Sequence, residues 1–271
     1  MATTMTVAIG GLGAIGLPVA RALDEGAVPG LRLVAVSARD VVKAEANLAG
    51  FAAPPAVVAA GELAGLAEVV VEVAPAAVFA EIAAPAVAAG RILIPLSVGA
   101  LLSQPQLIDQ ARNSGARIIV PSGAILGLDA VRAAAEGEID SVTLVTRKPP
   151  GGLAGAPYLM ANGIDVAGID EPMQVFAGNA REAAVGFPAN INVAAALSLA
   201  GVGPERTRVE IWADPTVTRN VHSIRVDGDA ARFEMSIENI PSAENPRTGR
   251  LTALSTIATL RGLVAPLHVG A

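Results

Sequence analysis

The chain has 271 residues, of which 52% are hydrophobic, 16% charged and only 3% aromatic, and its formal net charge is -6. This composition excludes disorder over most of the length. The acidic balance argues against binding to nucleic-acid phosphates, because no basic patch stands out. The chain contains no cysteine, which excludes disulfides, thiolate metal sites and cysteine nucleophiles and fits a cytoplasmic location.

The high hydrophobic content does not predict a membrane protein. The longest apolar run, Leu63–Ile82, contains three glutamates and Pro75, whereas a spanning helix needs about 18 or more uncharged apolar residues. The N-terminus lacks the basic segment of a signal peptide. Buried parallel strands, alanine-rich helices and a subunit interface can account for the surplus of Ala, Val and Leu.

Short apolar runs alternate with helical patterns along residues 1–121. The expected strands are Thr6–Gly10, Arg32–Ser37, Ala67–Val73, Arg91–Leu96 and Ala116–Val120. The expected helices are Ala14–Glu25, Val41–Ala49, Ala76–Ala89 and Gln104–Ser114. Because a strand, a helix and a second strand in succession form a parallel crossover unit, the pattern predicts an α/β fold with a doubly wound parallel sheet.

Strands without intervening helices dominate the second half. The expected strands are Ser141–Arg147, Arg208–Ala213, Asn220–Val226 and Ala231–Glu238, with a hairpin turn at residues 227–230. The expected helices are Leu128–Glu136, Pro188–Leu199 and Thr248–Leu263. We therefore predict a first domain over residues 1–121, completed by the C-terminal helix in 246–271, and an α+β domain with a largely antiparallel sheet over 122–245.

The first expected strand leads into a glycine-rich loop that contains GxGxxG at Gly11, Gly13 and Gly16. Gly11 permits a tight turn, Gly13 lets the backbone approach a pyrophosphate, and Gly16 lets the next helix pack against the strand. The helix N-terminus then faces the anion. This context favours dinucleotide binding over a glycine-rich turn without a ligand. The cofactor-binding residues expected here are Gly11, Leu12, Gly13, Ala14, Ile15 and Gly16.

The end of the second expected strand bears on the choice between NAD and NADP. Enzymes that use NAD usually carry an acidic residue there, which binds the ribose 2′-hydroxyl. This chain instead has Ser37 and, two residues later, Arg39. A hydroxyl and an arginine suit a 2′-phosphate, so we expect NADP or the use of both cofactors. Asp40 can either cap the next helix or support NAD binding.

The chain has two histidines, and only one of them lies within an expected element. His268 is close to the C-terminus, where chains are usually loosely ordered. His222 lies in an expected strand, where a single histidine is more often structural than catalytic. Because no cysteine is available, His222 is nevertheless the best-placed acid–base group at neutral pH. It is our candidate catalytic residue for hydride chemistry.

Three further segments carry residue types that are typical of ligand sites. Residues 121–129 follow the fifth expected strand, at the edge where open α/β sheets bind ligands, although a loop between domains is the alternative. Arg147 and Lys148 at a strand end can bind a substrate carboxylate or form a solvated rim. Asn190 and Asn192 favour a ligand contact, because asparagine is a poor residue for the first turn of an apolar helix.

Six segments together resemble the L-aspartate dehydrogenase family, and they occur in the family's order over essentially the whole chain. They are GGLGAIG at 10–16, PSGAILGLDA at 121–130, TRKPP at 146–150, FPANINVAAALSLAG at 187–201, DPTVTRNVHSI at 214–224 and ENPRTGRLTALSTIATL at 244–260. The resemblance implies a Rossmann domain plus an α+β substrate domain, usually in a homodimer. It also implies NAD(P)-dependent oxidative deamination of L-aspartate, and a link to NAD biosynthesis through iminosuccinate.

The resemblance assigns roles to individual residues. It places the family's catalytic histidine at His222 and its nicotinamide-side contacts at Ala124 and at the amide pair Asn190 and Asn192, without settling which asparagine is the principal contact. Leu126 departs from the family pattern, which often has a second glycine there. The missing acid after the second strand is another departure, and it places a strict NAD preference in doubt.

The expected reaction removes hydride from the α-carbon of L-aspartate once its amino group is neutral, and water then releases oxaloacetate and ammonia from iminosuccinate. His222 can take the amine proton, activate the water or orient the substrate, and the sequence leaves these roles open. The candidates for binding the substrate are Arg147, Lys148, Asn192 and Arg219. No metal is expected, because neither HxxxH nor a carboxylate cluster is present.

Two other interpretations stay open at the level of sequence. The chain can be a related two-domain reductase, similar to homoserine dehydrogenase or dihydrodipicolinate reductase. It can also be a nonenzymatic NAD(P)H sensor, although neither a basic helix nor an extra domain supports that. A polyol dehydrogenase is disfavoured, because residues 95–99 read PLSVG where such enzymes carry Glu-Lys-Pro.

Overall fold

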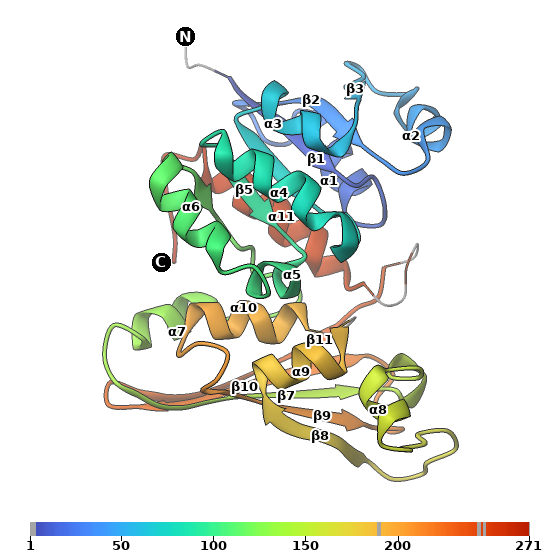
Figure 1. Cartoon of the computed structure of the whole chain (residues 1–271), viewed down its shortest axis with the longest axis vertical. Coiled ribbons are helices and arrows are strands. Elements are labelled where there is room, and N and C mark those ends of the chain that lie inside the picture. Colours follow the sequence, from blue (N-terminus) through green and yellow to red (C-terminus); the bar gives the residue numbers. More distant parts are fainter. Residues whose placement is uncertain (1–3, 189–190, 243–244, 246–247, 271) are drawn as a thin grey trace. The chain divides into compact units, whose positions relative to one another are not determined.

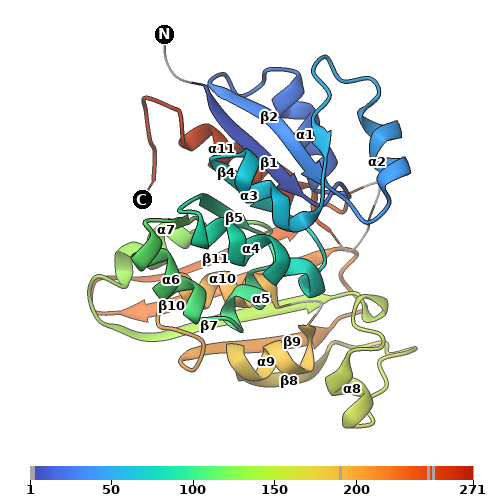
Figure 2. The same ribbon diagram turned by 45° about the horizontal axis from the view of Figure 1, so that its top comes forward.

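The chain folds into two structural units in a computed structural model, which describes residues 4–188, 191–242, 245 and 248–270 (Figure 1 and Figure 2). Unit 1 comprises Met1–Gly123 and Thr252–His268, and unit 2 comprises Ala124–Leu251 and Val269–Ala271. The sequence predicts domain boundaries at residues 121/122 and 245/246. Whether the two predicted domains fold independently stays a prediction.

The strands of unit 1 form a parallel sheet in the order β3-β2-β1-β4-β5-β6. These strands are β1 (Met5–Gly10), β2 (Leu31–Ser37), β3 (Ala56–Val57), β4 (Val69–Glu72), β5 (Ile92–Pro95) and β6 (Arg117–Ile118). The order reverses between β1 and β4, and open α/β sheets bind their ligands at the carboxyl edge of such a reversal. The expected doubly wound parallel sheet is confirmed.

Helices cover both faces of this sheet. One core contains side chains of α1 (Gly16–Asp24), α2 (Val41–Leu48) and α11 (Arg250–Gly262). The other contains side chains of α3 (Leu63–Leu66), α4 (Phe79–Ala88), α5 (Val98–Leu102) and α6 (Gln106–Ser114). Along β1, Val7 and Ile9 belong to the first core and Ala8 to the second. Because both faces are buried, these strands appear in the sequence as continuous apolar runs.

Unit 2 contains a mixed sheet in the order β11-β10-β7-β9-β8. Its strands are β7 (Ile139–Lys148), β8 (Met173–Asn179), β9 (Thr207–Ala213), β10 (Asn220–Gly228) and β11 (Arg232–Asn239). Only the pair β7 and β9 is parallel among the strand pairs of the described residues. The helices are α7 (Leu128–Ala134), α8 (Pro157–Ala161), α9 (Ala180–Gly186) and α10 (Asn192–Ala200). In Figure 1, α7, α9 and α10 lie on the same face of the sheet. The expected α+β architecture with a largely antiparallel sheet is confirmed.

Several elements differ from the sequence expectations. The helix expected over Pro188–Leu199 corresponds to α10, which covers Asn192–Ala200, and residues 189 and 190 lie outside the described residues. A preceding helix, α9, ends at Gly186, because the residue before a proline disfavours helical geometry; Phe187 accordingly has φ -135° and ψ 55°. Neither β8 nor α9 was predicted from the sequence. The reciprocal hydrogen bonds between Asn179 and Glu182 form a capping box, and the N-x-x-E spacing is a local sequence signal for the start of α9.

Other differences are small shifts of element ends. Helix α1 begins at Gly16 rather than Ala14, and α11 begins at Arg250 rather than Thr248. The expected hairpin between β10 and β11 is present, and its ladder extends to the pair Asp227 and Arg232. The turn itself therefore lies slightly later than residues 227–230. Short 3₁₀ turns occupy Ala60–Glu62, Ala76–Val78 and Pro150–Gly152.

The loop after β1 depends on glycine at two positions. Gly11 has φ +108°, and a Cβ there would lie 2.7 Å from the carbonyl oxygen of Val73. A Cβ on Gly16 would collide with the carbonyl oxygen of Gly11. A Cβ on Gly13, in contrast, would meet no atom of the described residues within 4 Å. Gly11 and Gly16 are thus required by the fold itself, whereas the space beside Gly13 is open.

Gly16→Ala should destabilise the protein, because the new Cβ meets backbone that cannot move without shifting α1. We expect a loss of about 2 kcal/mol in the free energy of unfolding, and a fall in Tm of about 4–8 °C. Gly13→Ala is the matched control and should change the free energy of unfolding by less than about 0.5 kcal/mol. Thermal unfolding followed by circular dichroism measures both, and equal Tm values for the two variants would contradict this interpretation.

Candidate active site

The glycine-rich loop of unit 1 connects the carboxyl end of β1 to α1. The N–H of Gly11 donates to the carbonyl oxygen of Ser37 (2.8 Å), and the N–H of Val73 donates to the carbonyl oxygen of Gly10 (2.9 Å). These bonds attach the loop to the ends of both neighbouring strands, β2 and β4. No side chain caps the start of α1 at Ile15, so its first N–H groups can face an anion.

The other loop residues predicted to bind the cofactor differ in burial: some pack against the core, and others are accessible to solvent. Leu12 and Ile15 are partly buried and pack against the core that contains α1 and α11. Ala14 is half-buried and Gly13 is exposed. The exposed backbone at Gly13 is therefore the part of the loop that a pyrophosphate can approach most closely.

The end of β2 presents one buried and two exposed polar residues. Ser37 is buried, with an exposed fraction of 7%, whereas Arg39 is exposed. Asp40 accepts a hydrogen bond from the N–H of Lys43 at 3.0 Å and caps α2. Of the two alternatives for Asp40, helix capping is confirmed. With one oxygen of Asp40 engaged in the cap, Arg39 is the charged group of this segment that is best suited to a ligand.

A buried carboxylate, that of Glu72, lies at the carboxyl end of β4, where the sequence shows only a charged residue within an apolar run. Glu72 accepts hydrogen bonds from the N–H of Ser97 (3.0 Å), the hydroxyl of Ser97 (2.9 Å) and the N–H of Ala74 (3.0 Å). Burial raises the pKa of Glu72, although these hydrogen bonds oppose the rise. Glu72 thereby fixes the segment after β5, in which polyol dehydrogenases would carry Glu-Lys-Pro.

His222 lies on β10 and is directly opposite Thr146 on β7. Its side chain is buried, with 4% exposed. The imidazole Nδ1 lies 3.0 Å from the hydroxyl oxygen of Thr146. Burial, and then the positive charge of Lys148, lower the pKa of His222 to about 3. The ring is therefore neutral at pH 7.

The neighbouring cations Arg147 and Lys148 point to opposite faces of the second sheet. Side chains alternate along a strand, so Lys148 shares the face of Thr146 and His222, whereas Arg147 shares the face of Trp212. Lys148 is 7% exposed, and burial lowers its pKa to about 8. The structure thus brings Lys148 and His222 together and separates Arg147 from them.

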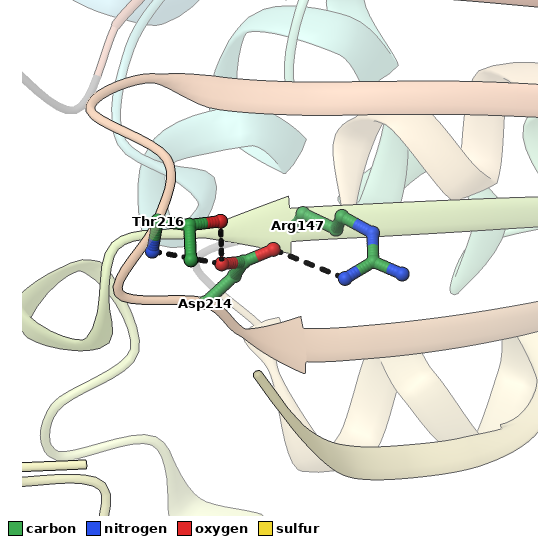
Figure 3. Close-up of polar contacts among 3 residues, drawn as sticks. All are labelled: Arg147, Asp214 and Thr216. Atoms are coloured by element: carbon green, nitrogen blue, oxygen red, sulfur yellow. Dashed lines mark hydrogen bonds and ion pairs between the residues drawn. The ribbon is translucent and has the colours of Figure 1, made fainter. Parts of the chain in front are cut away.

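Arg147 already has a carboxylate partner within the protein (Figure 3). Its Nη1 lies 3.0 Å from Oδ2 of Asp214. The guanidinium also lies 4.7 Å from the centre of the Trp212 ring. Asp214 also accepts hydrogen bonds from the N–H (2.9 Å) and hydroxyl (2.6 Å) of Thr216. Burial raises the pKa of Asp214, but the bonds from Thr216 and Arg147 outweigh it and hold the pKa below its ordinary value. This pairing engages the guanidinium of Arg147 within the protein.

Three other predicted site residues of unit 2, namely Ala124, Asn192 and Arg219, are within the described residues. The carbonyl oxygen of Ala124 accepts a hydrogen bond from Nδ2 of Asn239 at 2.9 Å, and Asn239 is buried at the end of β11. Asn192 is exposed at the first residue of α10, and Arg219 is exposed just before β10. Asn190 lies outside the described residues.

Four polar residues with buried contacts in these regions were not predicted as site residues from the sequence, namely Glu72, Thr146, Asp214 and Asn239. An aspartate followed two residues later by threonine at a strand end is typical of a side-chain-capped turn, and this local pattern is present at Asp214 and Thr216. The contacts of Thr146 and Asn239 depend on cross-strand register and on residues more than 70 positions away. No local pattern identifies them.

Within residues 4–188, 191–242, 245 and 248–270, no group of three or more His, Asp or Glu side chains is arranged to hold a metal ion. The described helices also include none that is long and apolar enough to cross a membrane.

Two family models match the chain. Residues 11–121 match the model described as the NAD binding domain of homoserine dehydrogenase. Residues 129–263 match the C-terminal domain of aspartate dehydrogenase. The first match supports dinucleotide binding by unit 1, and the second identifies the family of the unit that carries His222.

Curated relatives match the chain over nearly its whole length. An L-aspartate dehydrogenase from Bradyrhizobium diazoefficiens is 57% identical over 98% of this chain and 94% of the relative. One from Bordetella bronchiseptica is 53% identical, over 97% of both chains.

Solved structures agree with these sequence matches. The crystal structure of an aspartate dehydrogenase from Thermotoga maritima is 27% identical and superimposes with a TM-score of 0.75, over 98% of this chain and 99% of that one. A homoserine dehydrogenase from Thiobacillus denitrificans is 15% identical with a TM-score of 0.60, over 97% of this chain and 74% of that one, and it shows a shared fold alone. The identity and coverage of the aspartate dehydrogenases show that the chain belongs to the L-aspartate dehydrogenase family.

Proposed function

We propose that this protein catalyses the NAD(P)-dependent oxidative deamination of L-aspartate to iminosuccinate, which yields oxaloacetate and ammonia, or the reverse reaction. The observation that carries the proposal is the pair of His222 and Lys148 on one buried face, in a chain that is 57% identical to an L-aspartate dehydrogenase. The likeness to homoserine dehydrogenase is confined to residues 11–121 among the family models. It therefore favours a shared cofactor over a shared substrate.

The residues of unit 1 fit a dinucleotide. The open space beside Gly13 and the start of α1 without a side-chain cap suit a pyrophosphate. Ser37 and Arg39 lie where the ribose 2′-substituent would bind, which supports NADP or the use of both cofactors. Ala124 and the pair Asn190 and Asn192 are proposed for the nicotinamide side, on the family resemblance. When bound, the oxidised nicotinamide supplies a hydride acceptor.

The residues of unit 2 suit a substrate with two carboxylates. Lys148 has a pKa of about 8, so it is mostly protonated at pH 7 and can pair with one carboxylate. Arg219 is an exposed cation close to His222 in sequence and is proposed for the other. The substrate amine must lose its proton before hydride leaves the α-carbon. His222 is neutral at this pH and can contact the substrate without adding a second positive charge beside Lys148.

We also propose that the protein is a homodimer that acts in the cytoplasm and supplies iminosuccinate for NAD biosynthesis. The family resemblance supports the dimer and the pathway, and the absence of cysteine fits a reducing compartment. Sedimentation equilibrium of the purified protein tests the dimer directly, and a monomer at micromolar concentration would contradict it.

The reaction is tested by following nicotinamide absorbance with purified protein, L-aspartate and either NAD⁺ or NADP⁺. We expect turnover with L-aspartate and none with homoserine, malate or glucose. Absence of turnover in both directions, including oxaloacetate plus ammonia with NADH or NADPH, would overturn the proposal.

His222→Ala should lower kcat by at least about 10²-fold, because it removes the polar group proposed to contact the substrate. The matched control is His268→Ala, which replaces the other histidine of the chain at an exposed position. Steady-state kinetics with L-aspartate measures both variants. A His222→Ala enzyme within a few-fold of wild type would remove this residue from the mechanism.

Binding of a dicarboxylate should weaken as the pH rises through about 8. The folded-state pKa of Lys148 is lowered to about 8, so its positive charge is present below that pH and is lost above it. Succinate is a suitable probe because both of its carboxylates are already ionised at pH 7. Its Kd should rise about tenfold per pH unit above the pKa of Lys148, as measured by isothermal titration calorimetry on cofactor-saturated enzyme.

Two variants make this pH test specific. Lys148→Met should bind succinate weakly at every pH, and Lys148→Arg should bind it without the change near pH 8, because the arginine stays charged. A Lys148→Met enzyme that keeps the wild-type pH dependence would show that another group binds the carboxylate.

Arg39→Ala should reduce the preference for NADPH over NADH by about 10-fold or more, because a charge-assisted contact to the 2′-phosphate is lost. Lys43→Ala removes a nearby exposed cation and serves as the control. KM values for both cofactors, with oxaloacetate and ammonia, measure the change. Equal losses for NADH and NADPH would place Arg39 away from the 2′-position.

A further inference from the structure

The hydroxyl of Thr146 and the imidazole of His222 form a buried contact in the middle of the second sheet. The two residues are directly opposite each other on β7 and β10. Their exposed fractions are 7% and 4%, and the distance from Oγ1 to Nδ1 is 3.0 Å. Each of these strands pairs with neighbours on both of its sides, so the backbone holds both residues in place. A threonine side chain is also stiff about χ1.

The direction of this hydrogen bond follows from what each group can offer. A threonine hydroxyl has one hydrogen, and a neutral imidazole has one N–H donor and one acceptor nitrogen. Among the described residues, the contact with Nδ1 is the one hydrogen bond found for the Thr146 side chain. If Nδ1 carried the proton, the hydroxyl hydrogen would lack an acceptor at a buried position, which is costly. The hydroxyl therefore donates, Nδ1 accepts, and the ring proton is on Nε2.

We propose that Thr146 is a positioning residue that holds His222 in the tautomer with its proton on Nε2. The inference rests on the proposed function for the role of His222. In this tautomer, Nε2 presents an N–H donor and has no lone pair with which to accept a proton. Of the roles that the sequence left open, orientation of the substrate by hydrogen-bond donation to a carboxylate oxygen is therefore the one that the resting site supports.

The electrostatic surroundings agree with a neutral donor at this position. The positive charge of Lys148, on the same face, adds to burial in lowering the pKa of His222. A protonated imidazole would place two positive charges on one buried face, whereas a neutral ring with Nε2–H can share a carboxylate with Lys148. Two donors of this kind suit an anionic substrate.

The tautomer can be observed directly, because the chain has only two histidines. In protein labelled with ¹⁵N-histidine, long-range ¹H–¹⁵N correlation spectra distinguish a protonated from an unprotonated ring nitrogen, and His268→Ala assigns the signals. We expect Nε2 of His222 to be protonated and Nδ1 unprotonated at pH 7.5, in the wild type and in Thr146→Ser. Thr146→Val has the same shape without the hydroxyl and should show protonation at Nδ1 or a mixture of tautomers.

Kinetics then tests whether the tautomer matters for the reaction. We expect kcat for L-aspartate to fall about 3- to 10-fold in Thr146→Val, which is the effect expected for the loss of one neutral hydrogen bond. We expect kcat to recover in Thr146→Ser. A wild-type spectrum with Nδ1 protonated would overturn the proposal, as would an unchanged His222 spectrum in Thr146→Val. The expected spectra in a protein without aspartate oxidation would support the tautomer and contradict the proposed function, so the two failures are distinguishable.

Discussion

The two-residue period of β7 is the constraint on which the candidate site depends. Because successive side chains of a strand point to opposite faces, Thr146 and Lys148 join His222 on one face, and Arg147 lies on the other. A shift of one residue in the pairing of β7 with β10 would exchange these sets. The register is fixed by the apolar residues Leu144 and Ile224, which pair on the same buried face. The strand register that buries these apolar residues therefore also places Thr146, Lys148 and His222 on one face.

Burial gives the two faces different electrostatics. On the buried face, Lys148 and His222 have lowered pKa values because both lose contact with water. A lysine with a pKa near 8 is still mostly charged at neutral pH. On the opposite face, Arg147 is balanced within the protein by Asp214 and lies over Trp212. Two adjacent cations on one strand thus lie in different surroundings, one beside an imidazole on a buried face and the other beside a carboxylate and an indole ring.

In unit 1 the backbone, rather than side chains, determines the shape of the candidate anion site. Close approaches at Gly11 and Gly16 shape the loop, and its N–H and carbonyl groups connect it to the neighbouring strands. The start of α1 is then available to an anion without a dedicated side chain. Such a site has a local sequence signature, because glycine spacing and the preceding strand are both visible in one short segment. The site of unit 2 is built from side chains on β7 and β10, far apart in sequence, and has no comparable signature.

The sequence by itself determined the parallel sheet, the glycine loop, the α+β second half and the family, because each depends on local periodicity or on motifs that lie within a few residues. It also identified His222 and Lys148 as candidates. Edge strand β8 was missed because the residues of MQVFAGN alternate poorly, and pairing with β9 supplies what local propensity does not. Only the tertiary structure decided that Lys148 and not Arg147 lies beside His222, and that Thr146 contacts the imidazole. The physical reason is that these relations depend on strand register and burial, which arise when segments more than 70 residues apart pair across a sheet.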